Sequence, residues 1–195
     1  MYLMIRWFCA GIIIFLIIYS FGRNRKMSFA KFLIVGIGTL LLLIPFENYF
    51  IEFETIDELY KYKYSTNIPE DAIILYGKDS VKLIINDEET FYFAKDENGY
   101  KLSSNDSCAT ILYHKIVNDC SIRVFRFKKT NDYYISIVNL SGDYKKISDS
   151  EQTKFNSVVY NMSGKDYYYN HGYVYDLNDD YYIEIDGEKV YFDEK

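Results

Sequence analysis

The stretch ATILYHKIVNDCSIRVFRFKKTNDYYISIVNL, residues 109–140, decides the class of fold. It contains three runs rich in Ile, Val, Tyr and Phe, which are separated by ND at 118–119 and by TND at 130–132. β-branched and aromatic residues favour strands, and Asn and Asp favour tight turns. The stretch therefore predicts three short strands that are joined by turns.

The same signals continue on both sides of this stretch. The DG pair at 186–187 fits a two-residue hairpin turn. Short strands at this spacing predict an all-β sandwich, or an α+β unit followed by one. The further runs are AIILYG, SVKLIIN, ETFYFAK and GYKLSS before the stretch, and NSVVYNM, DYYYNHGYVYDL, YYIEID and KVYF after it.

One helix is expected in this part of the chain, at residues 56–64. Thr55 and Glu58 have the spacing of a capping box. Apolar residues follow at helical spacing, with Ile56, Leu59 and Tyr60 on one face.

Residues 149–162 fit two structures. Ser148 and Glu151 form a second capping-box pattern, and Phe155, Val158 and Met162 recur at helical spacing. The alternative is a loop followed by a strand through SVVYN, which local propensity favours. The sequence leaves this choice open.

The N-terminal part has a different composition. Residues 2–21 and 28–46 are two long apolar runs, and the loop between them, residues 22–27, is basic. Runs of this length predict two transmembrane helices, with the lipid bilayer as a partner. Arg23, Arg25 and Lys26 would determine the topology, because basic loops stay cytoplasmic. The C-terminal domain would then be extracytoplasmic, in a multi-pass protein of the cell membrane.

The expected fold is therefore a two-helix transmembrane hairpin followed by a mainly β domain, α+β and then β-sandwich-like. The hairpin would span residues 1–47, the α+β unit residues 48–107, and the sandwich-like unit residues 108–195. Whether the outer part is one domain or two is left open.

The chain also resembles a group of proteins. FETIDELYKYKYS at 53–65, AIILYGKDSVKLIIND at 72–87 and FYFAKDENGYKL at 91–102 look like uncharacterised membrane-anchored proteins of Gram-positive bacteria. In these proteins an F-x-T/S-x-x-E helix precedes a small meander of strands. The tail, ISDSEQTKF at 147–155 and YYYNHGYVYDLNDDYYIEIDGEKV at 167–190, is similar to their β-sandwich-like ends. The resemblance implies a location and an architecture, and it implies no activity.

No residue pattern predicts catalysis, a cofactor or a metal. His114 and His171 lack a second ligand at a metal-binding spacing. The acidic run at 176–180 departs from a calcium loop after its fifth position. The net charge of -6 argues against nucleic acid as a partner. We therefore expect a protein that is not an enzyme.

Cys108 and Cys120 are a possible disulfide if the domain lies outside the cell. A two-residue turn at Asn118 and Asp119 would place Val117 opposite Cys120 and leave Cys108 far along the strand. Buried free thiols are the alternative that this register favours.

The chain has 22 tyrosines, and they are the candidates for a binding surface. Exposed tyrosine offers a large rigid contact area with a polar tip. We expect a membrane-anchored, non-enzymatic cell-surface protein that contacts cell-envelope polymers or another membrane protein. The alternative is an accessory or immunity-type membrane subunit beside a transporter or sensor kinase. The candidate surface consists of Tyr167, Tyr169, Tyr173, Tyr175 and Tyr181.

Overall fold

The structure, a computed structural model, describes residues 8, 11–16, 19, 36–38, 51–85, 89–101, 109–128 and 130–192. The chain divides into two compact units, Met1–Ile51 and Glu52–Lys195. The second unit is mainly β, and each of its strand pairings is antiparallel. The expectation of a β-rich domain is confirmed.

The first unit corrects the expectation of a transmembrane hairpin. Its described residues before Ile51 are helical, and Gly38 packs closely against Ile13. Among the residues that the structure describes, no helix has both the length and the apolar character needed to cross a membrane. The multi-pass location and the extracytoplasmic side of the C-terminal domain therefore have no support. Most of the two expected spans, with Arg23, Arg25 and Lys26, lie outside the described residues.

Sheet A is the first of three sheets in the second unit. Its five strands lie in the order β1-β5-β4-β3-β2. Helix α4 (Ile56–Tyr64) lies between β1 and β2 in the chain and packs on one face of this sheet. The strands are β1 (Glu52–Phe53), β2 (Ile73–Tyr76), β3 (Ser80–Ile85), β4 (Glu89–Asp96) and β5 (Gly99–Lys101).

Helix α4 confirms the predicted helix and its cap. The Thr55 hydroxyl accepts a hydrogen bond from the backbone N–H of Glu58 at 3.2 Å. This bond satisfies one of the donors that a helix start leaves unpaired. Ile56, Leu59 and Tyr60 are buried against the sheet. Each such side chain contributes about 1.5–3 kcal/mol when fully buried.

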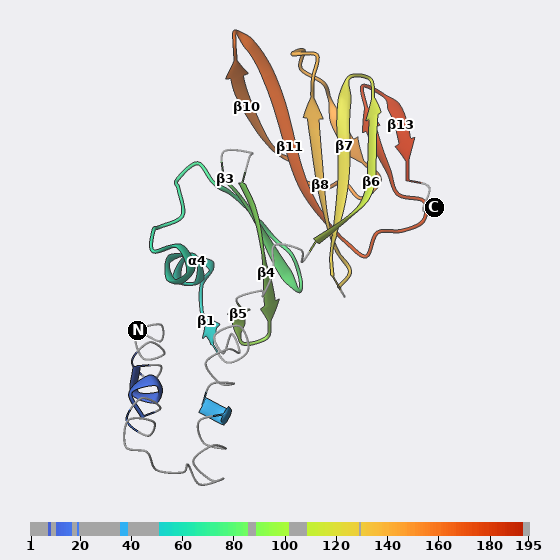
Figure 1. The fold of residues 1–195 in the computed structure, drawn as a ribbon. Helices are drawn as coiled ribbons and strands as arrows, with labels where there is room; N and C mark the ends of the chain where they lie inside the picture. Colours follow the sequence, from blue (N-terminus) through green and yellow to red (C-terminus); the bar gives the residue numbers. More distant parts are fainter. Residues whose placement is uncertain are drawn as a thin grey trace. The chain divides into compact units, whose positions relative to one another are not determined.

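Sheet B forms around the stretch 109–140. Figure 1 shows its five strands side by side in the order β10-β11-β8-β7-β6. Asn118 and Asp119 have positive φ, as do Ser163 and Gly164, so both hairpin turns have the twist that two-residue turns need. The strands are β6 (Ala109–Val117), β7 (Cys120–Phe127), β8 (Asp132–Asn139), β10 (Asn156–Met162) and β11 (Lys165–Tyr175).

The structure decides between a helix and a strand for residues 149–162. Residues 156–162 are strand β10, which pairs along its whole length with β11. The strand that local propensity favours is confirmed, and the helix is wrong. Tertiary pairing explains the outcome, because β11 offers an unpaired edge next to a β-branched run.

Sheet C closes the sandwich. It consists of β9 (Ile147–Asp149), β12 (Tyr182–Ile185) and β13 (Glu188–Tyr191), in the order β13-β12-β9. Asp186 and Gly187 form the predicted DG turn, and both have positive φ. Ile122, Ile135 and Ile137 of sheet B share one buried core with Ile183 and Ile185 of sheet C.

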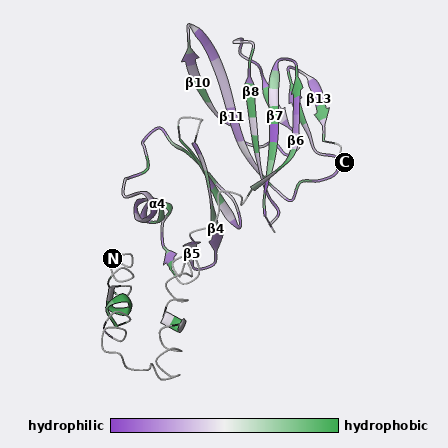
Figure 2. Cartoon of the chain, in the orientation of Figure 1, coloured by the Kyte–Doolittle hydropathy of each residue, from purple (hydrophilic) through white to green (hydrophobic). Residues whose placement is uncertain are grey.

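Sheet A packs on the other face of sheet B. Leu75 and Ile84 of sheet A form a buried cluster with Phe127 and Tyr134 of sheet B. Figure 2 shows hydrophobic and hydrophilic residues alternating along strands such as β7, as expected for strands whose two faces differ. The expected domain boundary after residue 107 falls in residues 102–108, which lie outside the described residues.

Candidate functional site

The candidate site lies on the face of sheet B that is turned away from sheet C. Side chains alternate along a strand, so Tyr167, Tyr169, Tyr173 and Tyr175 of β11 lie on one face, opposite in direction to the core residue Val174. We call this face the tyrosine face. It brings together four of the five tyrosines that the sequence proposed.

Tyr181 does not belong to this surface, and its assignment is corrected. It is 1% exposed and lies in the core between sheets B and C. Its hydroxyl donates to Asp149 Oδ2 at 2.6 Å. Burial, followed by the nearby Asp149 carboxylate, raises the pKa of the Tyr181 phenol.

The two halves of the tyrosine face differ in what covers them. Tyr173 packs against the cluster in which sheets A and B meet. Tyr175 is 42% exposed and bonds to Lys78 of the β2–β3 turn. We call the part around Asp132, Tyr134, Tyr173 and Tyr175 the closed half.

Asp132 is the centre of the closed half. It is 0% exposed, and its Oδ1 accepts from Tyr173 Oη at 2.8 Å and from the Lys78 N–H at 3.2 Å. Its Oδ2 accepts from the Asp79 N–H at 2.9 Å and from Ser80 Oγ at 2.5 Å. A buried carboxylate needs such donors, because burial without them is costly. Asp132 therefore fastens the β2–β3 turn of sheet A to sheet B.

The remaining contacts of the closed half strengthen this connection. The Ser80 hydroxyl lies 2.8 Å from Tyr134 Oη, which donates because Ser80 donates to Asp132. Lys78 Nζ donates to Tyr175 Oη at 3.0 Å, and this bond raises the pKa of Lys78. Tyr173 and Tyr175 thus have structural partners within the protein.

The other half of the tyrosine face surrounds the β10–β11 hairpin. Tyr160 pairs with Tyr167 across β10 and β11, and Val158 pairs with Tyr169, which in turn pairs with Val138 of β8. We call these five residues the open half. All five are partly exposed to solvent. Figure 1 shows the β10–β11 hairpin that carries most of them.

The rings of the open half are held by contacts with one another. The Tyr160 and Tyr169 centroids lie 5.4 Å apart at an interplanar angle of 85°. The Tyr169 ring also lies 6.5 Å from the His171 ring. The edge-to-face contact between Tyr160 and Tyr169 favours a fixed orientation of both rings.

His171 and His114 lie at the border between the two halves. The Ser136 hydroxyl accepts from Lys82 Nζ at 3.0 Å and lies 3.0 Å from His171 Nδ1. His114 is exposed, and its Nε2 lies 3.2 Å from Ser121 Oγ. Among the described residues, no three His, Cys, Asp or Glu side chains are placed to hold a metal ion.

Cys120 is a free thiol, 0% exposed, in the sandwich core. Burial raises the pKa of this thiol, so it is a poor nucleophile. It pairs with Val117 across the predicted turn, as the register argument expected. Cys108, its possible disulfide partner, lies outside the described residues.

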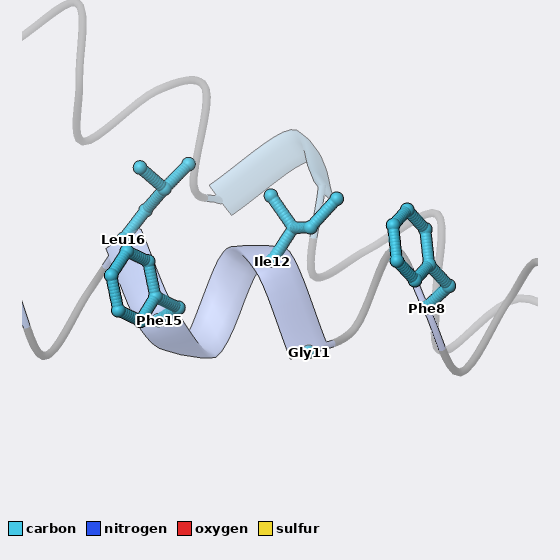
Figure 3. A pocket seen from close by; sticks show the side chains of 5 residues that line it. All are labelled: Phe8, Gly11, Ile12, Phe15 and Leu16. Carbon is cyan, nitrogen blue, oxygen red and sulfur yellow. The ribbon is translucent and has the colours of Figure 1, made fainter.

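The first unit contains an open depression of about 390 Å³. Figure 3 shows that Phe8, Ile12, Phe15 and Leu16 line it together with Gly11. Among the described residues, its lining offers no polar side chain to orient a ligand, which binding sites for small molecules usually have. We therefore place the candidate site on the tyrosine face.

Several residues of this site could not be found from the sequence. Asp132 sits in a TND turn signal, and the partner turn GKD lies more than 50 residues earlier. Tyr160 and Arg123 gain their place beside the tyrosines of β11 only through strand register. The signal that did work was the alternation of tyrosines along β11.

No family model, no curated protein and no solved structure matches the chain.

Proposed function

We propose that the chain is a non-enzymatic binding protein whose tyrosine-rich β domain contacts an extended polymer through the open half. The observation that carries this proposal is the grouping of Tyr160, Tyr167 and Tyr169 on one side of the β10–β11 hairpin. Each of these three tyrosines is partly exposed to solvent.

The contrast with the closed half supports the proposal. The phenols of Tyr173 and Tyr175 bond to Asp132 and Lys78. Tyr134 and Tyr181 are buried, as expected for tyrosines that complete the core. Tyr167 is partly exposed, with Lys165 Nζ 5.5 Å from the ring centroid.

The shape of the open half favours a polymer over a small molecule. Sheet faces are shallow, whereas small molecules bind in concave pockets. The hairpin presents a row of aromatic rings, and rigid aromatic side chains give contact area at low entropic cost. Repeating units could bind along such a row.

Affinity electrophoresis of the full chain tests the proposal. Native gels would contain soluble dextran or polygalacturonate, and retardation would report binding. We expect at least one polymer to retard the wild-type chain, and Tyr167→Ala to abolish most of the retardation. Tyr144→Ala is the matched control, because Tyr144 is 74% exposed and contacts Tyr168 rather than the open half.

Two outcomes would contradict the proposal. One is equal mobility of the wild-type chain in all polymer gels and in plain gels. The other is a retardation that Tyr167→Ala and Tyr144→Ala change equally, which would place the contact outside the open half. If a purified protein bound the wild-type chain but not the Tyr167→Ala variant, the ligand of the open half would be a protein and not a polymer.

A further inference from the structure

The tyrosine face has a charge pattern unlike that of the whole chain. The chain has 28 Asp and Glu against 22 Lys and Arg. On the described strands of sheet B, the tyrosine face holds no Asp or Glu between the row of Arg123 and His171 and the β10–β11 turn. The described strands of sheet B contribute Arg123 and Lys165 to this part of the face, and the buried Lys82 of sheet A donates to Ser136 in the same row as Arg123.

These cations lie on two sides of the tyrosines. Lys165 Nζ is close to the ring of Tyr167 and donates to the Leu140 carbonyl at 2.6 Å. Arg123 pairs with Ser136, which pairs with His171 of β11. From β10 to β7 the sheet extends about 14 Å, since neighbouring strands lie about 4.8 Å apart.

Arg123 is available to a ligand. Its side chain is exposed, and among the described residues it forms no ion pair. A guanidinium binds a carboxylate with two parallel hydrogen bonds, which gives both affinity and geometry. His114 is exposed beside it in the next strand, so a second donor is close.

We infer that the polymer bound by the open half is an anionic polysaccharide, an inference that rests on the proposed function. The tyrosine rings would stack on the apolar faces of sugar rings, and Arg123 would bind a sugar carboxylate. Nucleic acid fits less well, because its phosphates demand many cations and the chain has a pI of about 5.0. An acidic peptide would use the charges and leave the row of rings without a matching surface.

The test compares four probes on the immobilised full chain: polygalacturonate, dextran, poly-L-glutamate and oligothymidylate. We expect polygalacturonate to bind at least tenfold more tightly than each of the other three. Its binding should weaken as salt rises from 50 to 300 mM, because the contact is partly electrostatic and exposed. Arg123→Gln should weaken it about fivefold or more.

Lys115→Gln is the matched control for Arg123→Gln. Lys115 is exposed on the neighbouring strand and pairs with Ile122, so it lies on the opposite face of the sheet. Lys115→Gln removes one positive charge from the chain, as Arg123→Gln does, and it should leave binding unchanged. Equal losses in the two variants would overturn the placement at Arg123.

The outcomes separate the two claims. Equal binding of dextran and polygalacturonate, with loss in Tyr167→Ala, would overturn the anionic ligand and keep the polymer-binding function. Tighter binding of poly-L-glutamate or oligothymidylate would overturn the polysaccharide. Failure of every probe would contradict the anionic polysaccharide and the proposed function together.

Discussion

Tyrosine has different roles in the closed and open halves of the tyrosine face. Along β11, Tyr173 and Tyr175 bond to Asp132 and Lys78, whereas the partly exposed Tyr167 and Tyr169 contact Lys165 and Tyr160 of the β10–β11 hairpin. The spacing of the tyrosines along β11 does not distinguish the first pair from the second, because all four side chains lie on one face of the strand. What separates them is a turn from a distant part of the chain. The comparison shows that tyrosine content alone does not define a binding surface.

The largest expected effect comes from Asp132→Ala, which breaks the closed half. The change leaves the Asp79 N–H, Ser80 and Tyr173 without their acceptor in a buried place. We expect the free energy of unfolding to fall by about 3 kcal/mol, since each buried unpaired group costs about 1–3 kcal/mol. Urea denaturation measures this change in the free energy of unfolding.

Asp179→Ala is the control for this substitution. Asp179 is exposed, and its loss should change the free energy of unfolding by less than about 0.5 kcal/mol. A similar small change in Asp132→Ala would mean that the carboxylate does not hold the β2–β3 turn.

Gly77→Ala tests the close packing of the same turn. A Cβ at Gly77 would lie 2.6 Å from Asp132 Oδ2, 2.7 Å from Tyr134 Oη and 2.9 Å from the Ser80 carbonyl oxygen. These neighbours are fixed by their hydrogen bonds, so the turn must move. We expect a loss of about 1–3 kcal/mol, typical of overpacking. Gly164→Ala cannot serve as a matched control, because Gly164 has positive φ and alanine would be strained there even with enough space.

The expected outcome is a lower urea midpoint with an unchanged slope. An unchanged midpoint would show that the turn has room for a methyl group, and it would weaken the account of the closed half.

High pH should weaken the closed half. Burial raises the pKa of Tyr134 and of Tyr173 above the ordinary value of about 10. The unfolded chain then releases these protons at lower pH than the folded chain does. Their contribution is fully present below about pH 10 and is lost as pH rises beyond it, by up to about 1.4 kcal/mol per pH unit for each tyrosine.

Urea unfolding at pH 8, 9, 10.5 and 11 measures this slope. Tyr134→Phe should make the decline above pH 10 shallower than in the wild-type chain. The exposed Tyr144→Phe should leave the decline unchanged. A decline that begins well below pH 9 would assign the effect to groups other than these phenols.

The regular elements could be predicted from the sequence, because local signals determine them. The helix at 56–64, the turns at 118–119 and 186–187 and the tyrosine alternation along β11 follow from caps, turn residues and periodicity. The predicted transmembrane hairpin was wrong, because no helix among the described residues is long and apolar enough to cross a membrane.

Long-range contacts could not be predicted. The turn YGKDS shows only a hairpin, and nothing in it indicates that Asp132 binds its backbone. The burial of Tyr181 could have been predicted, because Tyr181 has the two-residue periodicity of Ile183 and Ile185 and is buried with them in the core.

The most direct test of the central claim compares Tyr173→Ala with Tyr167→Ala in the full chain. Each variant would be measured for urea stability and for binding to polygalacturonate. We predict that Tyr173→Ala lowers the free energy of unfolding by about 2 kcal/mol or more, because it removes a hydroxyl bond to Asp132 and a packed ring. Tyr167→Ala should lower it by less than about 1 kcal/mol, as expected for a cross-strand pair, and should abolish most of the binding. Equal stability losses in the two variants, or full binding by Tyr167→Ala, would contradict the division of the face into a structural half and a binding half.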